Sequence, residues 1–158
     1  LRVLPRLLQI LARFIELASE INTNMPRYVV SRILEGMNDR GKPLKGSKVL
    51  VLGVAYKPDI NDVRESPALD VIGLLQKKGA IVEFHDPYIP HIHHEYDGWR
   101  MDSVADMMKS VKEADAVVII TNHSGYDYKA IIEAAKFVFD SRNATGKFGK
   151  YHEKVERL

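Results

Sequence analysis

Four short apolar segments separated by helical patterns are the feature that most constrains the fold of this 158-residue chain. They cover residues 49–54, 81–85, 116–121 and 137–140. Such apolar strands are typical of a parallel sheet that helices cover on both faces. Serine caps, a stop glycine and helical spacing predict helices at residues 66–79, 103–111 and 128–135. The sequence therefore predicts an α/β fold with a Rossmann-like parallel sheet and flanking helices.

A long helical stripe precedes the first apolar segment. Apolar residues recur at helical spacing from Leu7 to Met37, and Pro26 interrupts the stripe without shifting its phase. One helix kinked at Pro26 is favoured over two helices, the second capped by Asn24. A single helix would be close to 50 Å long, so part of its stripe must pack against another surface. We therefore expect a homodimer formed through the helix of residues 7–38.

These patterns divide the chain into three parts. Residues 1–43 form the long helix and its linker, and residues 44–145 form the sheet domain. Residues 146–158 lack periodicity and are expected to be a tail. Within the sheet domain, residues 88–102 are expected to form an irregular loop.

Composition excludes several classes of site and partner. The chain has no cysteine, which excludes disulfides, thiolate metal sites and a cysteine nucleophile within it. A net charge of only +2 gives no reason to expect nucleic-acid binding. No apolar run approaches the roughly 20 residues of a membrane span, and no signal peptide is evident. A cytoplasmic protein without a membrane partner is the expectation.

Polar side chains follow each predicted strand. They are Tyr56-Lys57, Asp86, Asn122-His123 and Ser141-Arg142. Ligands of open parallel sheets bind beyond the carboxyl ends of the strands, where these residues should converge. Two cations, a histidine and several hydrogen-bonding groups suit an anionic ligand such as a nucleoside diphosphate, although each residue could equally be part of a solvated loop.

The turn after the first strand differs from that of a dinucleotide-binding fold. Such a fold needs G-x-G-x-x-G, whereas the turn here reads GVAYK from Gly53 to Lys57 and keeps only the first glycine. Tyr56 would obstruct the close backbone approach that the second glycine permits. Asp86 is therefore interpreted as a loop cap before Pro87 rather than as a ribose-binding acid.

Residues 53–67, GVAYKPDINDVRESP, carry the most specific signal. They resemble the start of the C-terminal domain in the UDP-glucose/GDP-mannose dehydrogenase family, where an aromatic-lysine pair precedes D-x-R-x-S-P. The likeness continues through His85-Asp86-Pro87, residues 116–122 and Phe139-Asp140-Ser141-Arg142, and it covers roughly residues 12–145. With Met25-Pro26-Arg27-Tyr28, it is most similar to the branch acting on UDP-N-acetylglucosamine and UDP-N-acetylmannosamine.

The resemblance implies roles for individual residues. Tyr56, Lys57 and Arg142 match positions that contact the nucleotide-sugar, and Lys57 would offset diphosphate charge. Arg64 matches an arginine that reaches the NAD held by another domain, while an ion pair with Asp62 or Glu65 is the competing interpretation. No residue of this chain is assigned a catalytic role. Four clustered histidines, His85, His91, His93 and His94, are expected to be solvated loop residues rather than a metal site.

The resemblance also implies an activity for the whole enzyme. Family members oxidise the sugar C6 alcohol to a carboxylate in two NAD-linked steps through a cysteine nucleophile. That cysteine and the NAD-binding glycine motif belong to regions that this chain does not match, so the chain is expected to bind a UDP-sugar and to be inactive alone. Two alternatives stay open: a free-standing nucleotide-sugar-binding or regulatory module, and a dimerisation element built on the long helix.

Overall fold

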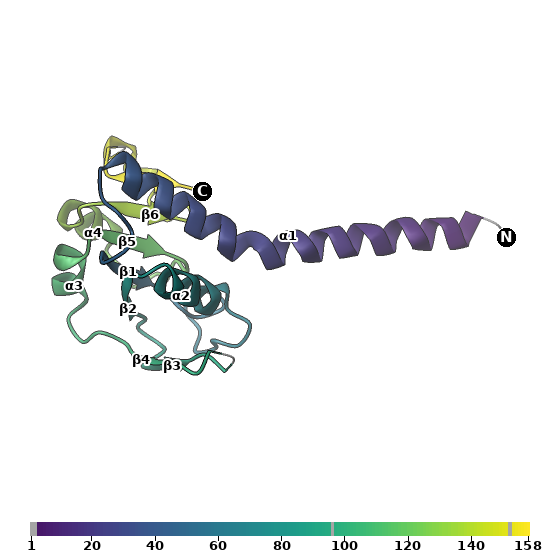
Figure 1. Ribbon diagram of the computed structural model, residues 1–158, viewed down its shortest axis with the longest axis horizontal. Coiled ribbons are helices and arrows are strands. Elements are labelled where there is room, and N and C mark those ends of the chain that lie inside the picture. The colour runs from purple at the N-terminus through teal and green to yellow at the C-terminus, as the bar shows by residue number, and fades with distance from the viewer. Residues whose placement is uncertain (1–2, 96, 152) are drawn as a thin grey trace.

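A central parallel sheet organises the chain, whose computed structural model describes residues 3–95, 97–151 and 153–158 (Figure 1). Five parallel strands lie in the order β2-β1-β5-β6-β7. Their bounds are Lys48–Leu52 (β1), Ile81–His85 (β2), Ala116–Ile119 (β5), Val138–Asp140 (β6) and Val155–Arg157 (β7). The predicted fold class is confirmed, and the four predicted strands correspond to β1, β2, β5 and β6.

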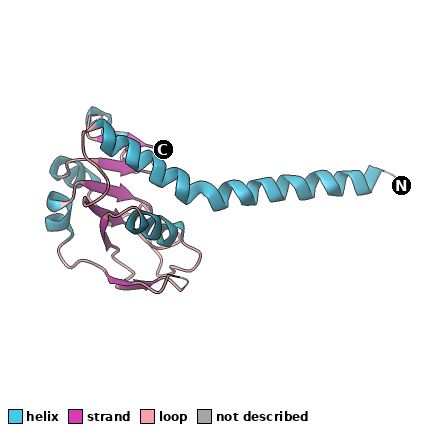
Figure 2. Ribbon diagram, viewed as in Figure 1, coloured by secondary structure: helices cyan, strands magenta, loops and turns pink. Residues whose placement is uncertain are grey.

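Helices cover both faces of the sheet (Figure 2). On one face lie α1 (Val3–Asp39) and α2 (Pro67–Lys77), and on the other lie α3 (Met107–Glu113) and α4 (Tyr128–Ala134). Successive side chains of a strand point to opposite faces, so Val51 packs toward α1 and α2 while Leu50 packs toward α3 and α4. All four residues of β5 are buried, as expected of a central strand covered on both sides.

Helix α1 runs without interruption from Val3 to Asp39 and contains Pro26, which confirms one helix rather than two. Its ribbon bends between the free part and the part that packs on the sheet (Figure 1). Proline removes one backbone hydrogen bond and crowds the preceding turn, which bends a helix. Asn24 does not cap a second helix, because its side-chain amide donates to the Glu20 carbonyl.

Only the C-terminal part of α1 is buried by the domain. Its buried apolar residues run from Val29 to Met37, whereas the large apolar side chains between Leu7 and Ile21 are about half exposed or more. The free part of α1 projects away from the sheet (Figure 1). Among the described helices, none is long and apolar enough to cross a membrane.

Two segments differ from the expectations. Within the expected loop of residues 88–102, strands β3 (His91–His93) and β4 (Arg100–Asp102) form an antiparallel pair. The next helix, α3, begins at Met107 and is capped by Asp106 rather than Ser103. The Ser103 hydroxyl instead accepts the backbone N–H of Asp86, which removes it from the helix. Three-residue strands are too short for their alternation to be recognised in a sequence.

The expected tail also carries structure. Residues Gly146–Tyr151 form a 3-10 turn, and Val155–Arg157 add the fifth strand, β7, parallel to β6. The guanidinium of Arg40, just after α1, donates to the Glu156 carboxylate at 2.6 Å and lies 4.1 Å from the Phe137 ring centroid. The end of the chain is therefore part of the sheet domain, and the description of residues 146–158 as a tail is wrong.

Candidate functional site

The strand order reverses direction between β1 and β5. From β1 the chain reaches β2 on one side, and it then returns to place β5, β6 and β7 on the other. At such a switch point the loops that follow neighbouring strands diverge, leaving a crevice beyond the carboxyl ends of the strands. Gly53, at the end of β1, has φ +78°, and a Cβ there would collide with the Thr121 carbonyl after β5. Glycine therefore lets the two strand ends approach closely.

Two of the predicted site residues line one hollow at this edge. The hollow has a volume of about 450 Å³ and lies between α1 and the carboxyl ends of the strands. Tyr56 and Arg142 both line it, with Ser141 from the end of β6 and Val29 from α1. Tyr56 is 50% exposed, so its ring is available to a ligand. The convergence of Tyr56 and Arg142, 86 positions apart in the sequence, is as expected from the parallel sheet.

Lys57 lies beside this hollow rather than in its wall. Its side chain is exposed, and its Nζ is 5.6 Å from the centroid of the Tyr56 ring. A lysine has a long flexible side chain that reaches a phosphate as a mobile point charge. Its position beside Tyr56, which lines the hollow, therefore suits a charge-offsetting role toward a ligand bound there.

Asp140 positions Arg142. This buried carboxylate ends β6 and accepts the backbone N–H groups of Arg142, Ala144 and Thr145 at 2.8–3.2 Å, with the Thr145 hydroxyl at 2.6 Å. The loop after β6 is thereby fixed while the guanidinium of Arg142 stays exposed. Arg142 also lines a second hollow of about 360 Å³ together with Asn122 and Arg157. Asn122 was among the residues predicted to follow a strand, whereas Arg157 was not predicted to lie near the site.

Arg64 forms an ion pair with Asp62, which was the alternative to its predicted contact with NAD. Its Nε and Nη2 donate to the two carboxylate oxygens at 3.0 and 2.8 Å, and its backbone N–H donates to the same carboxylate. These hydrogen bonds lower the pKa of Asp62 from 3.8 to about 2. The Arg64 side chain remains 87% exposed, so the pair orients it without burying it.

Replacing Arg64 by alanine should raise the pKa of Asp62 from about 2 toward 3.8, because the guanidinium donors that stabilise its charged form are removed while the backbone N–H of residue 64 remains. A folded-state pKa below the ordinary value stabilises the loop above pH 3.8, and that stabilisation is lost as the pH falls toward 2. Carboxyl carbon NMR of the Asp62 titration measures the shift. An unchanged Asp62 titration in the Arg64→Ala chain would contradict the pairing.

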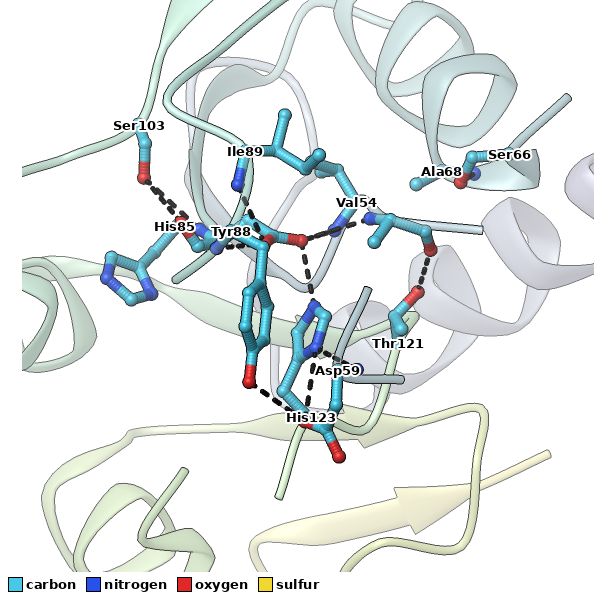
Figure 3. Close-up of polar contacts among 12 residues, drawn as sticks. Val54, Asp59, Ser66, Ala68, His85, Tyr88, Ile89, Ser103, Thr121 and His123 are labelled. Atoms are coloured by element: carbon cyan, nitrogen blue, oxygen red, sulfur yellow. Dashed lines mark hydrogen bonds and ion pairs between the residues drawn. The ribbon is translucent and has the colours of Figure 1, made fainter. Parts of the chain in front are cut away.

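A buried aspartate-histidine pair lies just beyond the ends of β2 and β5, and Figure 3 shows its histidine, His123. Asp86 follows β2 and His123 follows β5, and both side chains are fully buried. His123 Nε2 lies 2.9 Å from Asp86 Oδ2, and His123 Nδ1 accepts the backbone N–H of Asp59 at 2.9 Å. Asp86 caps the following loop as expected, since it accepts the N–H groups of Tyr88 and Ile89. The position of both residues at strand ends was predicted from the sequence, whereas the contact between them was not.

The same pair determines whether NAD fits this strand end. In a dinucleotide fold the N–H groups after the first strand face the pyrophosphate. Here the N–H groups of Val54 and Ala55 donate to Asp86 at 2.7 and 3.0 Å. A second anion at this position would meet the Asp86 carboxylate rather than free donors. The residues of this turn therefore do not fit the phosphates of a dinucleotide.

The clustered histidines lie in different environments. His91 and His93 are exposed on β3, and His94 stacks on Trp99 with ring centroids 5.3 Å apart. Burial lowers the pKa of His85, whose Nδ1 lies 3.1 Å from the Tyr126 hydroxyl. Within residues 3–95, 97–151 and 153–158, no three histidine, aspartate or glutamate side chains are arranged to hold a metal ion.

The chain is similar in sequence to proteins of one dehydrogenase family. The sequence model described as the UDP-glucose/GDP-mannose dehydrogenase family, UDP binding domain, matches residues 50–147. A UDP-N-acetyl-D-mannosamine dehydrogenase of Methanococcus maripaludis is 32% identical over 140 residues, which cover 84% of this chain and 30% of the relative. A UDP-glucose 6-dehydrogenase of Bacillus subtilis, TuaD, is 34% identical over 110 residues, covering 70% and 23%.

Solved structures show the same fold. An NDP-N-acetyl-D-galactosaminuronic acid dehydrogenase of Methanosarcina mazei superposes with a TM-score of 0.72 at 28% identity, covering 90% of this chain and 30% of that one. A UDP-D-ManNAc dehydrogenase of Pyrococcus horikoshii gives 0.68 at 27% identity, covering 81% and 29%. The chain thus spans about 30% of the length of the first curated relatives. It belongs to the UDP-glucose/GDP-mannose dehydrogenase family, and it corresponds to the UDP binding domain.

Proposed function

We propose that this chain is the nucleotide-sugar-binding part of an NAD-dependent UDP-N-acetylhexosamine 6-dehydrogenase. The observation that carries the proposal is the placement of Tyr56 and Arg142 on one hollow at the carboxyl edge of the sheet, with Lys57 beside it. An arginine fork binds phosphate oxygens in pairs, and a lysine adds charge without a fixed direction. A tyrosine ring offers an apolar face with a hydroxyl at its tip, which suits the polar ring of a nucleoside.

The family match supports UDP as the nucleotide, because the matching model is that of a UDP binding domain. The N-acetylhexosamine is proposed from the relatives, several of which are named UDP-N-acetyl-D-mannosamine dehydrogenases. In this arrangement Arg142 binds the diphosphate or the ribose, Tyr56 lies against the nucleoside, and Lys57 balances phosphate charge. The ordered loops after β1 and β6 would keep these side chains in place before the ligand arrives, which lowers the entropic cost of binding.

Oxidation itself requires groups that this chain does not supply. The hydride acceptor is NAD, and its phosphates do not fit the turn after β1, where Asp86 already accepts the backbone N–H groups. Arg64, exposed and oriented by Asp62, is proposed to reach the cofactor from this side of the active site. Since the chain has no cysteine for aldehyde capture, we expect the 158-residue chain alone to produce no NADH from a UDP-sugar.

We also propose that two chains associate through α1. The free part of this helix exposes a set of large apolar side chains that the sheet domain does not reach. An apolar surface of this length is usually an interface. A second copy supplies an identical stripe, and two such helices can pack with two-fold symmetry. The division into residues 1–43 for association and residues 44–145 for binding is part of this proposal, with β7 added to the second part.

Replacing Lys57 or Arg142 by alanine should weaken UDP binding by roughly ten- to a hundredfold each, which is the loss of one charge-assisted hydrogen bond. Both side chains are exposed, so the folded domain should melt at an unchanged temperature. Titration calorimetry with UDP measures the affinity. Lys112→Ala is a matched control, because this exposed lysine lies in the last turn of α3, shortly before the amino end of β5 and thus at the opposite edge of the sheet. Equal UDP affinity in all three variants and the original chain would contradict the proposed site.

A further inference from the structure

The Asp86 carboxylate is a charged group buried directly after β2. It is fully buried and accepts hydrogen bonds from three different loops. Oδ2 accepts from Val54, Ala55 and the His123 imidazole, and Oδ1 accepts from Tyr88 and Ile89. A buried carboxylate with its lone pairs satisfied in this way is costly to disturb and holds its donors in fixed positions.

The hydrogen bonds of His123 define its tautomer. The backbone N–H of Asp59 donates to Nδ1, so Nδ1 carries the lone pair and Nε2 carries the hydrogen that is donated to Asp86. The Asp59 carboxylate accepts the Ser124 N–H at 2.9 Å, and the Tyr88 ring packs 5.1 Å from the imidazole centroid. The imidazole therefore connects the buried Asp86 carboxylate to Asp59, in the middle of the loop that follows β1. Figure 3 shows His123 beside Asp59.

The segment held by these contacts is the one that carries the ligand-facing side chains. Val54 and Ala55 are fixed by Asp86 on one side of Tyr56-Lys57, and Asp59 is fixed by His123 on the other. Asp59 has φ +61°, a left-handed conformation that the hydrogen bond to His123 helps to maintain. Both ends of a three-residue stretch are thus tied to one buried pair, while the Tyr56 and Lys57 side chains remain exposed.

We propose that Asp86 and His123 are positioning residues for the nucleotide-sugar site, holding residues 54–59 so that Tyr56 and Lys57 face the ligand. The inference rests on the proposed function. Neither residue lines the hollow of about 450 Å³, so both act through the loop rather than on the ligand. Because the N–H groups of Val54 and Ala55 donate to Asp86, they are not available to a phosphate. The same hydrogen bonds fix the loop that carries Tyr56 and Lys57 toward the nucleotide-sugar.

Three substitutions separate this role from a merely structural one. His123→Phe keeps an aromatic ring and removes both hydrogen bonds, whereas His123→Gln retains one donor and one acceptor. Asp86→Asn keeps the shape and turns one accepting oxygen into a donor that faces other donors. His123→Phe and Asp86→Asn should each weaken UDP binding about tenfold through loss of loop order, and His123→Gln should stay within about threefold of the original affinity. Calorimetry measures these affinities below the melting temperature of each variant.

Ile132→Val is the matched control. Ile132 is fully buried in the cluster on the opposite face of the sheet, so this variant should melt at a lower temperature with unchanged UDP affinity. Amide hydrogen exchange gives a readout that needs no ligand. The amides of Val54, Ala55 and Asp59 should exchange faster in His123→Phe and Asp86→Asn, and at the original rate in Ile132→Val.

The outcomes distinguish the two proposals. An original chain that binds no UDP contradicts the proposed function, whatever the exchange rates are. The positioning inference is overturned by a folded His123→Phe or Asp86→Asn chain that keeps the original UDP affinity and the original exchange at residues 54–59. If His123→Phe fails to fold, Asp86→Asn and His123→Gln carry the same comparison. If Ile132→Val weakens UDP binding as much as Asp86→Asn does, the effect is one of general stability and the inference is also overturned.

Discussion

Replacing Phe14 and Ile21 together by glutamate should convert an associated chain into a monomer. Both side chains are on the exposed stripe of α1, at 70% and 54% exposure, and lie seven residues apart on one helix face. Burying such a side chain contributes about 1.5–3 kcal/mol, so a two-fold interface that loses four of them loses roughly 6–12 kcal/mol. Light scattering in high salt measures the mass, because a hydrophobic interface persists where charge attraction is screened.

The control for added charge is Gln9→Glu with Thr23→Glu. Both positions are exposed on the same helix, and its helical repeat places them on the face of Glu16 and Glu20, away from the stripe. The doubly charged control should keep the mass of the original chain. An original chain that is monomeric at high concentration would refute association through α1, and an oligomer that persists in the Phe14→Glu, Ile21→Glu chain would place the interface elsewhere.

Replacing Gly53 by alanine should lower the free energy of unfolding by about 3 kcal/mol or more. Left-handed φ costs a residue with a Cβ about 1–2 kcal/mol, and here the Cβ also collides with the Thr121 backbone. Backbone atoms cannot move aside as a flexible side chain can, so β1 and β5 must separate. Thermal unfolding followed by circular dichroism should show a fall of roughly 10 °C.

Gly98→Ala isolates the steric part of this effect. Gly98 also has positive φ, at +70°, but a Cβ there meets nothing within 4 Å. Its substitution should therefore cost only the backbone strain of about 1–2 kcal/mol. Equal melting temperatures for Gly53→Ala and Gly98→Ala would show that the close approach of β1 and β5 does not require glycine.

The fold could largely be predicted because its strands and long helices carry strong periodic signals. Fully apolar strands such as β5 are recognisable in the sequence, and Pro26 did not disturb the phase of α1. The strands β3, β4 and β7 were not predicted, since each has three residues and a mixed or polar sequence. Strand β7 forms by pairing with the edge of β6. This is a tertiary interaction that a local sequence pattern does not predict.

The site could be predicted in part for a similar reason. Tyr56 and Arg142 follow parallel strands, so the topology alone brings them to one edge. The contact between Asp86 and His123 depends on the order of β2, β1 and β5 across the sheet, and that order is not written in any one segment. The Ser103 hydroxyl was assigned to a helix cap, while the structure gives it to the Asp86 backbone. Hydrogen bonds between a side chain and a backbone group far away in the sequence are therefore the part of the site that sequence patterns do not predict.

Calorimetric titration of the 158-residue chain with UDP and, separately, with NAD tests the central claim most directly. The hollow at the carboxyl edge presents Tyr56 and Arg142, whereas the turn after β1 has its N–H groups bonded to Asp86. We expect measurable binding of UDP, weaker than that of an intact two-part site, and little or no binding of NAD. Tighter binding of NAD than of UDP would contradict the assignment of this sheet to the nucleotide-sugar.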